Sequence, residues 1–239
     1  MTFLIHSRSN IANMHLLNLF IKRAFDIVSC SLAIITLVPV WIIVSVAIKI
    51  DSKGPVFFKQ ARRTKDGRVF QMLKFRSMYV GAEKQGTGLF SYDNDPRVTK
   101  VGAFLRKTSI DEFPQFFNVL LGDISVVGPR PCVPYELGDY DTLNKKYKKR
   151  FHMKGGITGL AQCKGRNKIS WDVKASFDGE YVDLFKKEGV WLDIKILWWT
   201  VIKVLHSENI NEGRRDGMTA EESSILDNDE IKRIAHLPD

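Results

Sequence analysis

KRAFDIVSCSLAIITLVPVWIIVSVAIKID, residues 22–51, decides the fold class of this 239-residue chain. No charged residue occurs from Ile27 to Ile48, a run of 22 residues. As an α-helix this run would be about 33 Å long, which is enough to cross a bilayer. It is too long for an ordinary buried helix, and it is too long and starts too late for a cleaved signal peptide. The stretch therefore predicts a membrane-inserted segment at residues 22–50.

Two features leave the topology of this segment open between a spanning helix and a re-entrant one. Pro39, near its middle, lacks a backbone N–H and clashes with the preceding turn, so a kink or break is expected there. Both flanks are basic, and the positive-inside tendency would keep both ends in the cytoplasm. A helix–break–helix that enters one leaflet and returns satisfies both observations, although its broken backbone must find partners because lipid supplies none. The flanking cations are Arg8, Lys22 and Arg23 before the segment, and Lys49, Lys53, Lys59, Arg62 and Arg63 after it.

The overall composition predicts a globular, basic protein of a reducing compartment. Hydrophobic residues make up 44% of the chain, and a net charge of +9 with a pI near 9.4 suggests an anionic partner. Cys30, Cys132 and Cys163 are odd in number and far apart, and the five histidines show no metal-binding spacing. These patterns argue against a disulfide framework and a zinc site. The sequence contains neither a Walker A motif nor GxGxxG.

Charge and hydropathy divide the chain into four parts. Residues 207–239 hold nine acidic and four basic side chains, so the rest of the protein is even more basic than the total suggests. We expect an N-terminal leader over residues 1–21, the membrane-inserted segment at 22–50, a cytosolic domain that carries the chemistry at 51–206, and a weakly ordered acidic tail at 207–239.

The start of the cytosolic domain has the pattern of a β-hairpin. Two apolar stretches flank Asp66-Gly67, a pair that suits the positive φ angles of a tight turn. If residues 68–78 are extended, Lys74 and Arg76 share one face because strand side chains alternate with a period of two. The two cations would then point at one anionic partner, or they would lie on an ordinary solvated edge.

The rest of the domain predicts mainly helices, so the fold class is α+β, mainly helical, with a small β-hairpin. Residues 95–107 fit a short helix. A second helix begins around Phe113, where apolar residues recur with helical spacing, and ends at Gly122. Residues 192–205 fit a third helix, whose apolar stripe and tryptophan pair suit either core packing or an amphipathic helix lying in the membrane interface.

Two adjacent carboxylates, Asp111 and Glu112, precede the second helix and allow two interpretations. Ser109 and Glu112 have the spacing of a capping box, and acidic residues near a helix N-terminus are stabilised by the helix dipole. Alternatively, the N–H groups and positive potential of the helix start would hold Asp111 ionised as a nucleophile, while Glu112 binds Mg²⁺. Taken by itself, the motif favours the cap.

Three further motifs gather positive charge or glycine. GPRP (128–131) predicts a rigid turn that presents one guanidinium to a phosphate. KKYKKR (145–150) is either a solvated face or a surface attracted to anionic lipid. The glycine-rich run 154–167 predicts tight turns, which either approach a ligand closely or form a plain loop.

Together these motifs resemble the bacterial sugar transferase family, the monotopic polyprenyl-phosphate phosphoglycosyl transferases. The resemblance covers about residues 22–206, and KFRSM, the acid pair and GPRP at these separations are highly specific to that family. The lack of a large N-terminal extension is similar to the minimal forms, such as the undecaprenyl-phosphate bacillosamine-phosphate transferases. The matching stretches are KRAFD (22–26), KFRSM (74–78), DPRVTKVGAFLRKTSIDEFPQFFNVLLGDISVVGPRP (95–131), GITGLAQCKGRN (156–167) and LDIKIL (192–197).

This resemblance implies an enzyme that transfers a phosphosugar from a UDP-sugar to undecaprenyl phosphate and releases UMP. That reaction is the first membrane step of glycan assembly, for a glycoprotein, capsule, O-antigen or exopolysaccharide. Asp111 would form a covalent aspartyl-phosphosugar intermediate, and Glu112 would hold Mg²⁺. The implied substrate-binding residues are Lys74, Arg76, Arg62, Arg106, Arg130, Pro129, Pro131, Lys154 and Arg166, with a helix break at Pro39.

The resemblance also implies a place in the cell. The protein would lie in the bacterial inner membrane among its lipids, with the catalytic domain on the cytoplasmic face, a re-entrant segment, and no nucleic acid as a partner. Two positions depart from the family pattern. The usual Ser-Pro break reads Val38-Pro39, and the loop that is often Arg-Pro-Gly reads Lys154-Gly155-Gly156, which keeps a charge but loses the bidentate guanidinium.

Two alternative functions remain open. A membrane-tethered basic adaptor that binds anionic lipid or nucleic acid would tolerate the substitution Asp111→Asn. A metal-dependent diphosphate hydrolase would transfer to water and ignore undecaprenyl phosphate. The sugar, the glycan pathway and the oligomeric state do not follow from the sequence.

Overall fold

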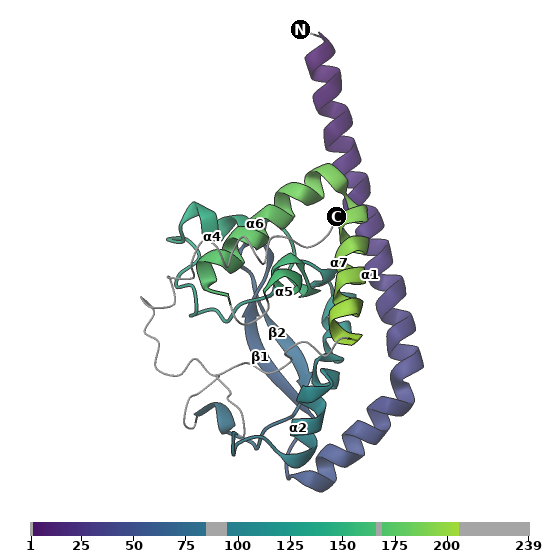
Figure 1. The fold of residues 1–239 in the computed structure, drawn as a ribbon, viewed down its shortest axis with the longest axis vertical. Helices are drawn as coiled ribbons and strands as arrows, with labels where there is room; N and C mark the ends of the chain where they lie inside the picture. The colour runs from purple at the N-terminus through teal and green to yellow at the C-terminus, as the bar shows by residue number, and fades with distance from the viewer. Residues whose placement is uncertain (1, 85–94, 166–168, 206–239) are drawn as a thin grey trace.

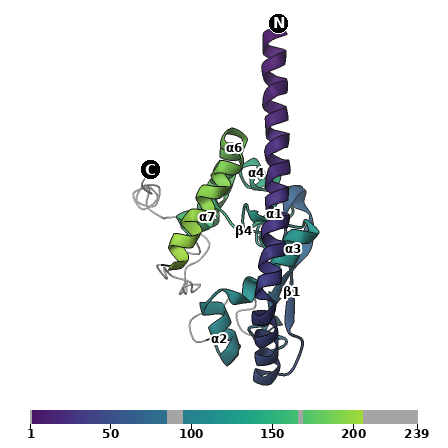
Figure 2. The same ribbon diagram turned by 90° about the vertical axis from the view of Figure 1, so that its right-hand side faces the viewer.

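The computed structural model of the 239-residue chain describes residues 2–84, 95–165 and 169–205. A single long helix, α1 (Thr2–Asp51), forms the N-terminal part, and the remaining elements gather along it (Figures 1 and 2). The expected mainly helical α+β class with small sheets is confirmed. The other helices and strands are β1 (Phe57–Arg63), β2 (Val69–Phe75), α2 (Lys100–Lys107), α3 (Gln115–Leu121), β3 (Ser125–Val127), α4 (Lys145–Lys149), β4 (Gly156–Thr158), α5 (Leu160–Lys164), α6 (Trp171–Glu188) and α7 (Val190–Leu205). Short 3₁₀ turns in the described residues are η1 (Lys65–Gly67), η2 (Ala82–Lys84), η3 (Ile110–Glu112) and η4 (Arg150–His152).

The helix break expected at Pro39 is a bend inside one helix. α1 continues through Pro39 without interruption, and Figure 1 shows it turning over its C-terminal third. A single proline removes one backbone hydrogen bond and displaces the preceding turn, so a kinked helix is a sufficient response. Among the described helices, α1 alone is long and apolar enough to cross a membrane by length and composition, and only 11% of its most apolar window is buried.

The motif KRAFD (22–26) ties α1 to the rest of the protein through buried polar contacts. Lys22 Nζ lies 2.6 Å from the Asp193 carboxylate on α7 and also donates to a carbonyl of β3. Asp26 accepts hydrogen bonds from a hydroxyl and a backbone N–H of β3. Arg23 donates to two carbonyls at the C-terminal end of α3. The sequence marked this motif as a family signature but gave it no structural role.

The hairpin is confirmed: β1 and β2 pair antiparallel, and Phe57 lies opposite Phe75. Asp66 and Gly67 supply the expected positive φ angles of 55° and 77° at the turn. The short strands β3 and β4 pair in parallel, which brings the glycine-rich run against the GPRP turn. A Cβ on Gly156 would lie 2.1 Å from a backbone nitrogen of that turn. The close approach that these glycines permit is therefore made to the protein's own backbone.

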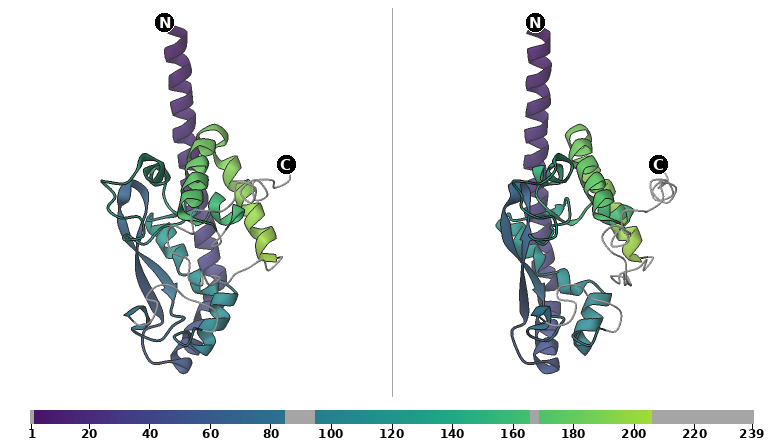
Figure 3. Two further views of the ribbon diagram at one scale, coloured as in Figure 1. Left: turned by 60° about the vertical axis from the view of Figure 1, so that its left-hand side comes forward. Right: turned by 90° about the vertical axis from the view of Figure 1, so that its left-hand side faces the viewer.

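The helices α6 and α7 form a hairpin on one flank of the molecule (Figure 3). Tyr181 and Phe185 of α6 pack with Ile196 of α7 in the largest buried cluster. The apolar stripe expected within residues 192–205 faces outward, because Ile194 and Trp198 are more than half exposed. Of the two alternatives for this stripe, the amphipathic interfacial helix is the one the packing favours.

The basic run 145–150 is engaged by α6. Lys146 and Lys149 form ion pairs with Asp172 and Asp183, and Arg150 forms a buried ion pair with another α6 carboxylate at 2.9 Å. Much of the positive charge that a lipid surface would have attracted is therefore paired within the protein.

Candidate active site

The two acids lie in the turn η3, between α2 and α3. The capping box is wrong: Ser109 adopts a left-handed conformation with φ 57°, and its side chain makes no capping hydrogen bond. α3 begins later than expected, at Gln115, with Pro114 in the N-cap position, whereas Gly122 ends it with a φ of 86° as expected. The acid pair therefore occupies a separate turn ahead of α3.

Glu112 is held by two cations that approach from different segments. Lys74 Nζ on β2 and Arg130 Nη2 in the GPRP turn lie 3.0 Å and 2.9 Å from its Oε1. Burial opposes ionisation of Glu112, but the charges and hydrogen bonds of Arg130 and Lys74 outweigh it and hold the pKa of this carboxyl well below its ordinary value. Glu112 is therefore a fixed anion with one oxygen fully engaged.

Asp111 differs from its neighbour because it is buried, with 9% of its surface exposed, and no hydrogen bond to its carboxylate is found within the described residues. Burial raises its pKa to about 6; Lys74 lowers it, Glu112 raises it, and Arg106 lowers it. Burial therefore has a larger effect on the pKa of Asp111 than the surrounding cations do. Above pH 6 the group is a poorly solvated carboxylate, which is the state that a nucleophile requires.

Asp111 opens into a cleft of about 200 Å³. Four of the predicted cations line it with Asp111, namely Lys74, Arg76, Arg62 and Arg106. The structure therefore brings together residues from β1, β2, α2 and η3 that are separated by up to 49 positions in the sequence. Positive charge around a carboxylate suits a reaction between anions, since it lowers the repulsion between nucleophile and substrate.

Arg76 and Arg62 already have partners inside the protein. The Arg76 guanidinium is buried and donates to carbonyls just after α1 at 2.7 Å and 3.0 Å, so it caps that helix. Arg62 donates to the Gln60 side chain at 2.7 Å and 3.0 Å and to the Pro131 carbonyl at 3.2 Å. Lys74 and Arg76 share the cleft, as the strand period predicts, but they bind different acceptors: Lys74 binds a carboxylate, and Arg76 binds backbone carbonyls just after α1.

The remaining predicted residues are not gathered around Asp111. The Pro129 carbonyl accepts the N–H of Gly156 and so fixes the turn that carries Arg130. Lys154 lies toward the other end of α3, where a Cβ on Gly122 would be 3.4 Å from its Nζ. Burial, followed by the charge of Arg23, lowers the pKa of Lys154. Arg166 lies outside the described residues.

An apolar wall of the cleft was missed from the sequence. Phe57, Phe58 and Phe75 line it, together with Tyr79. Phe58 could have been found, because the period of two places it on the same face as the predicted Arg62. Phe57 and Phe75 face each other across the two strands, and that pairing depends on a register the sequence does not specify.

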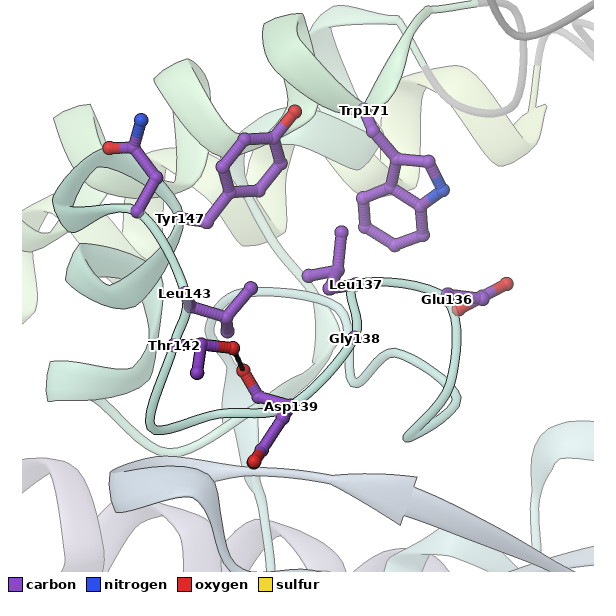
Figure 4. A pocket seen from close by; sticks show the side chains of 9 residues that line it. Glu136, Leu137, Gly138, Asp139, Thr142, Leu143, Tyr147 and Trp171 are labelled. Carbon is purple, nitrogen blue, oxygen red and sulfur yellow. Dashed lines mark hydrogen bonds between the residues drawn. The ribbon is translucent and has the colours of Figure 1, made fainter.

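A second cavity, of about 420 Å³, lies between the loop after GPRP and α6 (Figure 4). Tyr147 and Trp171 flank it, and the Thr142 hydroxyl donates to the Asp139 carbonyl at 3.2 Å, as Figure 4 shows. It shares no lining residue with the cleft of Asp111. Its carboxylates, which include Glu136, make it a poor site for an anion.

The donors at the acid pair would suit a Mg²⁺ ion only if phosphate oxygens completed its ligand set. Within the described residues no group of three or more His, Cys, Asp or Glu side chains could hold a metal. Glu112 Oε2 accepts no hydrogen bond from the described part of the chain, while Oε1 is engaged. Mg²⁺ is commonly bound by one or two carboxylates plus substrate phosphates, so this small donor set is compatible with it.

Comparison with known proteins places these residues within one recognised family. Residues 17–207 match the family model described as "Bacterial sugar transferase". A Klebsiella pneumoniae protein named UDP-glucose:undecaprenyl-phosphate glucose-1-phosphate transferase is 45% identical over 190 residues, which are 78% of this chain and 40% of that protein. The galactosyl transferase CpsE of Streptococcus agalactiae is 42% identical, over 79% of this chain and 43% of its own length.

A relative of similar size is the uncharacterized sugar transferase EpsL of Bacillus subtilis. It is 44% identical over 200 residues, which cover 81% of this chain and 92% of that protein. In contrast, the chain spans about two fifths of the length of the Klebsiella relative.

Proposed function

The chain belongs to the bacterial sugar transferase family, and on this premise we propose that it transfers a sugar 1-phosphate from a UDP-sugar to undecaprenyl phosphate and releases UMP. One observation carries the proposal: the buried Asp111 shares a cationic cleft with Lys74 and Arg106, while Glu112 beside it is fixed as an anion. A basic adaptor has no need of a desolvated carboxylate surrounded by cations.

The chemistry follows from the position of Asp111. Its carboxylate oxygen attacks the β-phosphorus of the UDP-sugar, the bond from that phosphorus to the bridging oxygen breaks, and UMP leaves with the bond's electrons. A phosphate oxygen of undecaprenyl phosphate then attacks the same phosphorus, which frees Asp111 and forms the diphosphate-linked sugar. Lys74 and Arg106 lie where they neutralise phosphate charge in both steps, and Arg130 keeps Glu112 in place.

We further propose that Glu112, through Oε2, takes part in holding Mg²⁺ with the donor diphosphate. When bound, the ion supplies positive charge that offsets the charge of the two phosphates. Since Lys74 and Arg130 already occupy Oε1, Glu112 needs no rearrangement to offer its other oxygen.

We infer that α1 enters the membrane from one face only, although it is long enough to span it. Lys22 fixes one end of the apolar segment to α7, and Arg76, which directly follows β2, caps the other end. A spanning helix would place these two ends on opposite sides of the bilayer, yet one folded body holds both. This supports a re-entrant segment in the bacterial inner membrane, with the domain on the cytoplasmic face, where UDP-sugars are available.

The test is UMP release by the purified protein with Mg²⁺, undecaprenyl phosphate and separate UDP-sugars, beside the variant Asp111→Asn. The relatives' names, which print UDP-glucose and a galactosyl transfer, direct the panel first to UDP-glucose and UDP-galactose. N-acetylated donors, including a bacillosamine type, complete the panel. We expect UMP from one donor, its loss in the variant, and label from the sugar in the lipid fraction. Equal release by the variant would remove Asp111 as the nucleophile, and label released to water would favour the diphosphate hydrolase.

A further inference from the structure

Four aromatic side chains from four elements meet beside the cleft. Trp41 of α1 is in edge contact with Phe75 and Phe117, with ring centroids 5.4 Å and 5.1 Å apart. Phe57 stacks on Phe75 at 5.4 Å with an interplanar angle of 21°. Both stacked rings also line the cleft that holds Asp111. The cluster therefore connects the long apolar helix to the cleft that holds the candidate nucleophile.

The apolar surface continues from this cluster onto the helix. Val38 and Ile42, which flank Trp41 on α1, are about half exposed or more, and Phe57 itself is 42% exposed. Lys74 and Arg106 line the same cleft. The cleft thus combines an apolar part, which continues onto the exposed apolar surface of α1, with cations that attract an anion.

This division of polarity matches one of the two substrates better than the other. A polyprenyl phosphate is an anion joined directly to a hydrocarbon chain that extends into the bilayer. A nucleotide sugar has polar groups on both sides of its diphosphate and gains little from phenyl rings facing lipid. The chain of the acceptor must also reach the site from the membrane, and α1 is the element that lies there.

We propose that Trp41, Phe57 and Phe75 form the docking surface for the first isoprene units of the lipid acceptor, which place its phosphate among Lys74 and Arg106. The proposal rests on the function proposed above and makes it more specific. Only the second half-reaction uses the acceptor, so these rings act after the aspartyl-phosphosugar has formed. Exchange of labelled UMP into the UDP-sugar needs no acceptor and reports the first half-reaction alone.

The test variant is Phe57→Ala, because a ring that is 42% exposed is removed without opening a sealed cavity. The matched control is Phe104→Ala on α2, where an equally apolar ring is 60% exposed and does not line the cleft. Phe57→Leu retains an apolar side chain and serves as the conservative replacement. A polyprenyl phosphate with a photoreactive group near its phosphate provides an independent measurement.

We expect Phe57→Ala to raise the KM for undecaprenyl phosphate about tenfold, equivalent to about 1.4 kcal/mol, with unchanged UMP exchange. Phe57→Leu should recover most of the loss, Phe104→Ala should match wild type, and the photoprobe should label a peptide containing Trp41 or Phe57. An unchanged acceptor KM, or a parallel loss of UMP exchange, would overturn the proposal. Absence of exchange in the wild-type protein would instead refute the proposed function itself.

Discussion

Replacement of the candidate nucleophile is expected to stabilise the folded protein while it abolishes activity. In the native state Asp111 is buried, and its pKa rises from the ordinary 3.8 to about 6. An acid with a raised native pKa binds its proton more tightly when folded, so its ionised form destabilises the fold. This penalty is absent below pH 3.8 and complete above pH 6. Asp111→Asn keeps the shape of the side chain and removes the titration.

The magnitude follows from the two pKa values. Their difference corresponds to about 3 kcal/mol at about 1.36 kcal/mol per pKa unit, as an upper limit for neutral pH. For a folded part of about 200 residues, each kcal/mol moves the melting temperature by about 2–4 °C, so the variant should melt roughly 6–12 °C higher at pH 7.5. At pH 4 the two proteins should melt close together, because Asp111 is then largely protonated in the fold.

The assay is thermal unfolding of both proteins in the same detergent at pH 4, 5, 6 and 7.5, without Mg²⁺ or UDP-sugar, whose binding would add stability. Glu112→Gln is the control of opposite sign. Because cations lower the native pKa of Glu112, its ionised form stabilises the fold above its ordinary pKa of 4.5. That variant should melt below wild type at pH 7.5, with a gap that narrows on acidification. A pH-independent difference between Asp111→Asn and wild type, or a less stable variant at pH 7.5, would refute the reasoning.

Four other predictions concern single positions. Arg76→Ala should lower the melting temperature because it uncaps α1, whereas Arg106→Ala should keep the melting temperature and slow UMP exchange; equal thermal losses would contradict this division. Lys22→Met should cost about 3–5 kcal/mol of unfolding free energy, since it leaves Asp193 buried without its cation; denaturant unfolding measures it. Lys154→Ala should leave the UMP exchange rate within about twofold of wild type, and a tenfold loss would place Lys154 at the donor. The rate of exchange should rise through about pH 6 as the nucleophilic carboxylate ionises, and a flat profile from pH 5 to 8 would contradict that pKa.

Features specified by neighbouring residues could be predicted from the sequence. The hairpin follows from Asp66-Gly67 between apolar stretches, and the end of α3 follows from Gly122. A reactive role for the acid pair was only one of two interpretations of the sequence. The local motif favoured the other interpretation, the capping box. The capping box does not form because two cations attract the Glu112 carboxylate more strongly than a backbone N–H does. These are Lys74 and Arg130, which lie 38 and 18 positions from Glu112 in the sequence.

Charge alone did not indicate which cations serve the cleft. Lys154 follows a family position and lies in a glycine-rich run that contacts the GPRP turn, yet its side chain is directed to the end of α3. The backbone position was predictable from the motif, but the side-chain direction depends on α1, since Arg23 and Gly122 define the space that it enters. The raised pKa of Asp111 could not be predicted from the sequence either, because it results from desolvation in the packed cleft.

The motif KFRSM (74–78) has a role that neither its charge nor its strand period reveals. Lys74 binds Glu112, and Arg76, two residues further along, caps the end of α1. The rise of about 3.3 Å per strand residue spaces the backbones of these two residues by about 7 Å, so one short segment contacts both the acid pair and the end of the helix. If α1 sets the depth of the protein in the membrane, the same strand sets the height of Asp111 relative to the lipid phosphate. A shift of one residue in this strand would turn both cations to the other face, so that Lys74 would leave Glu112 and Arg76 would leave the end of α1.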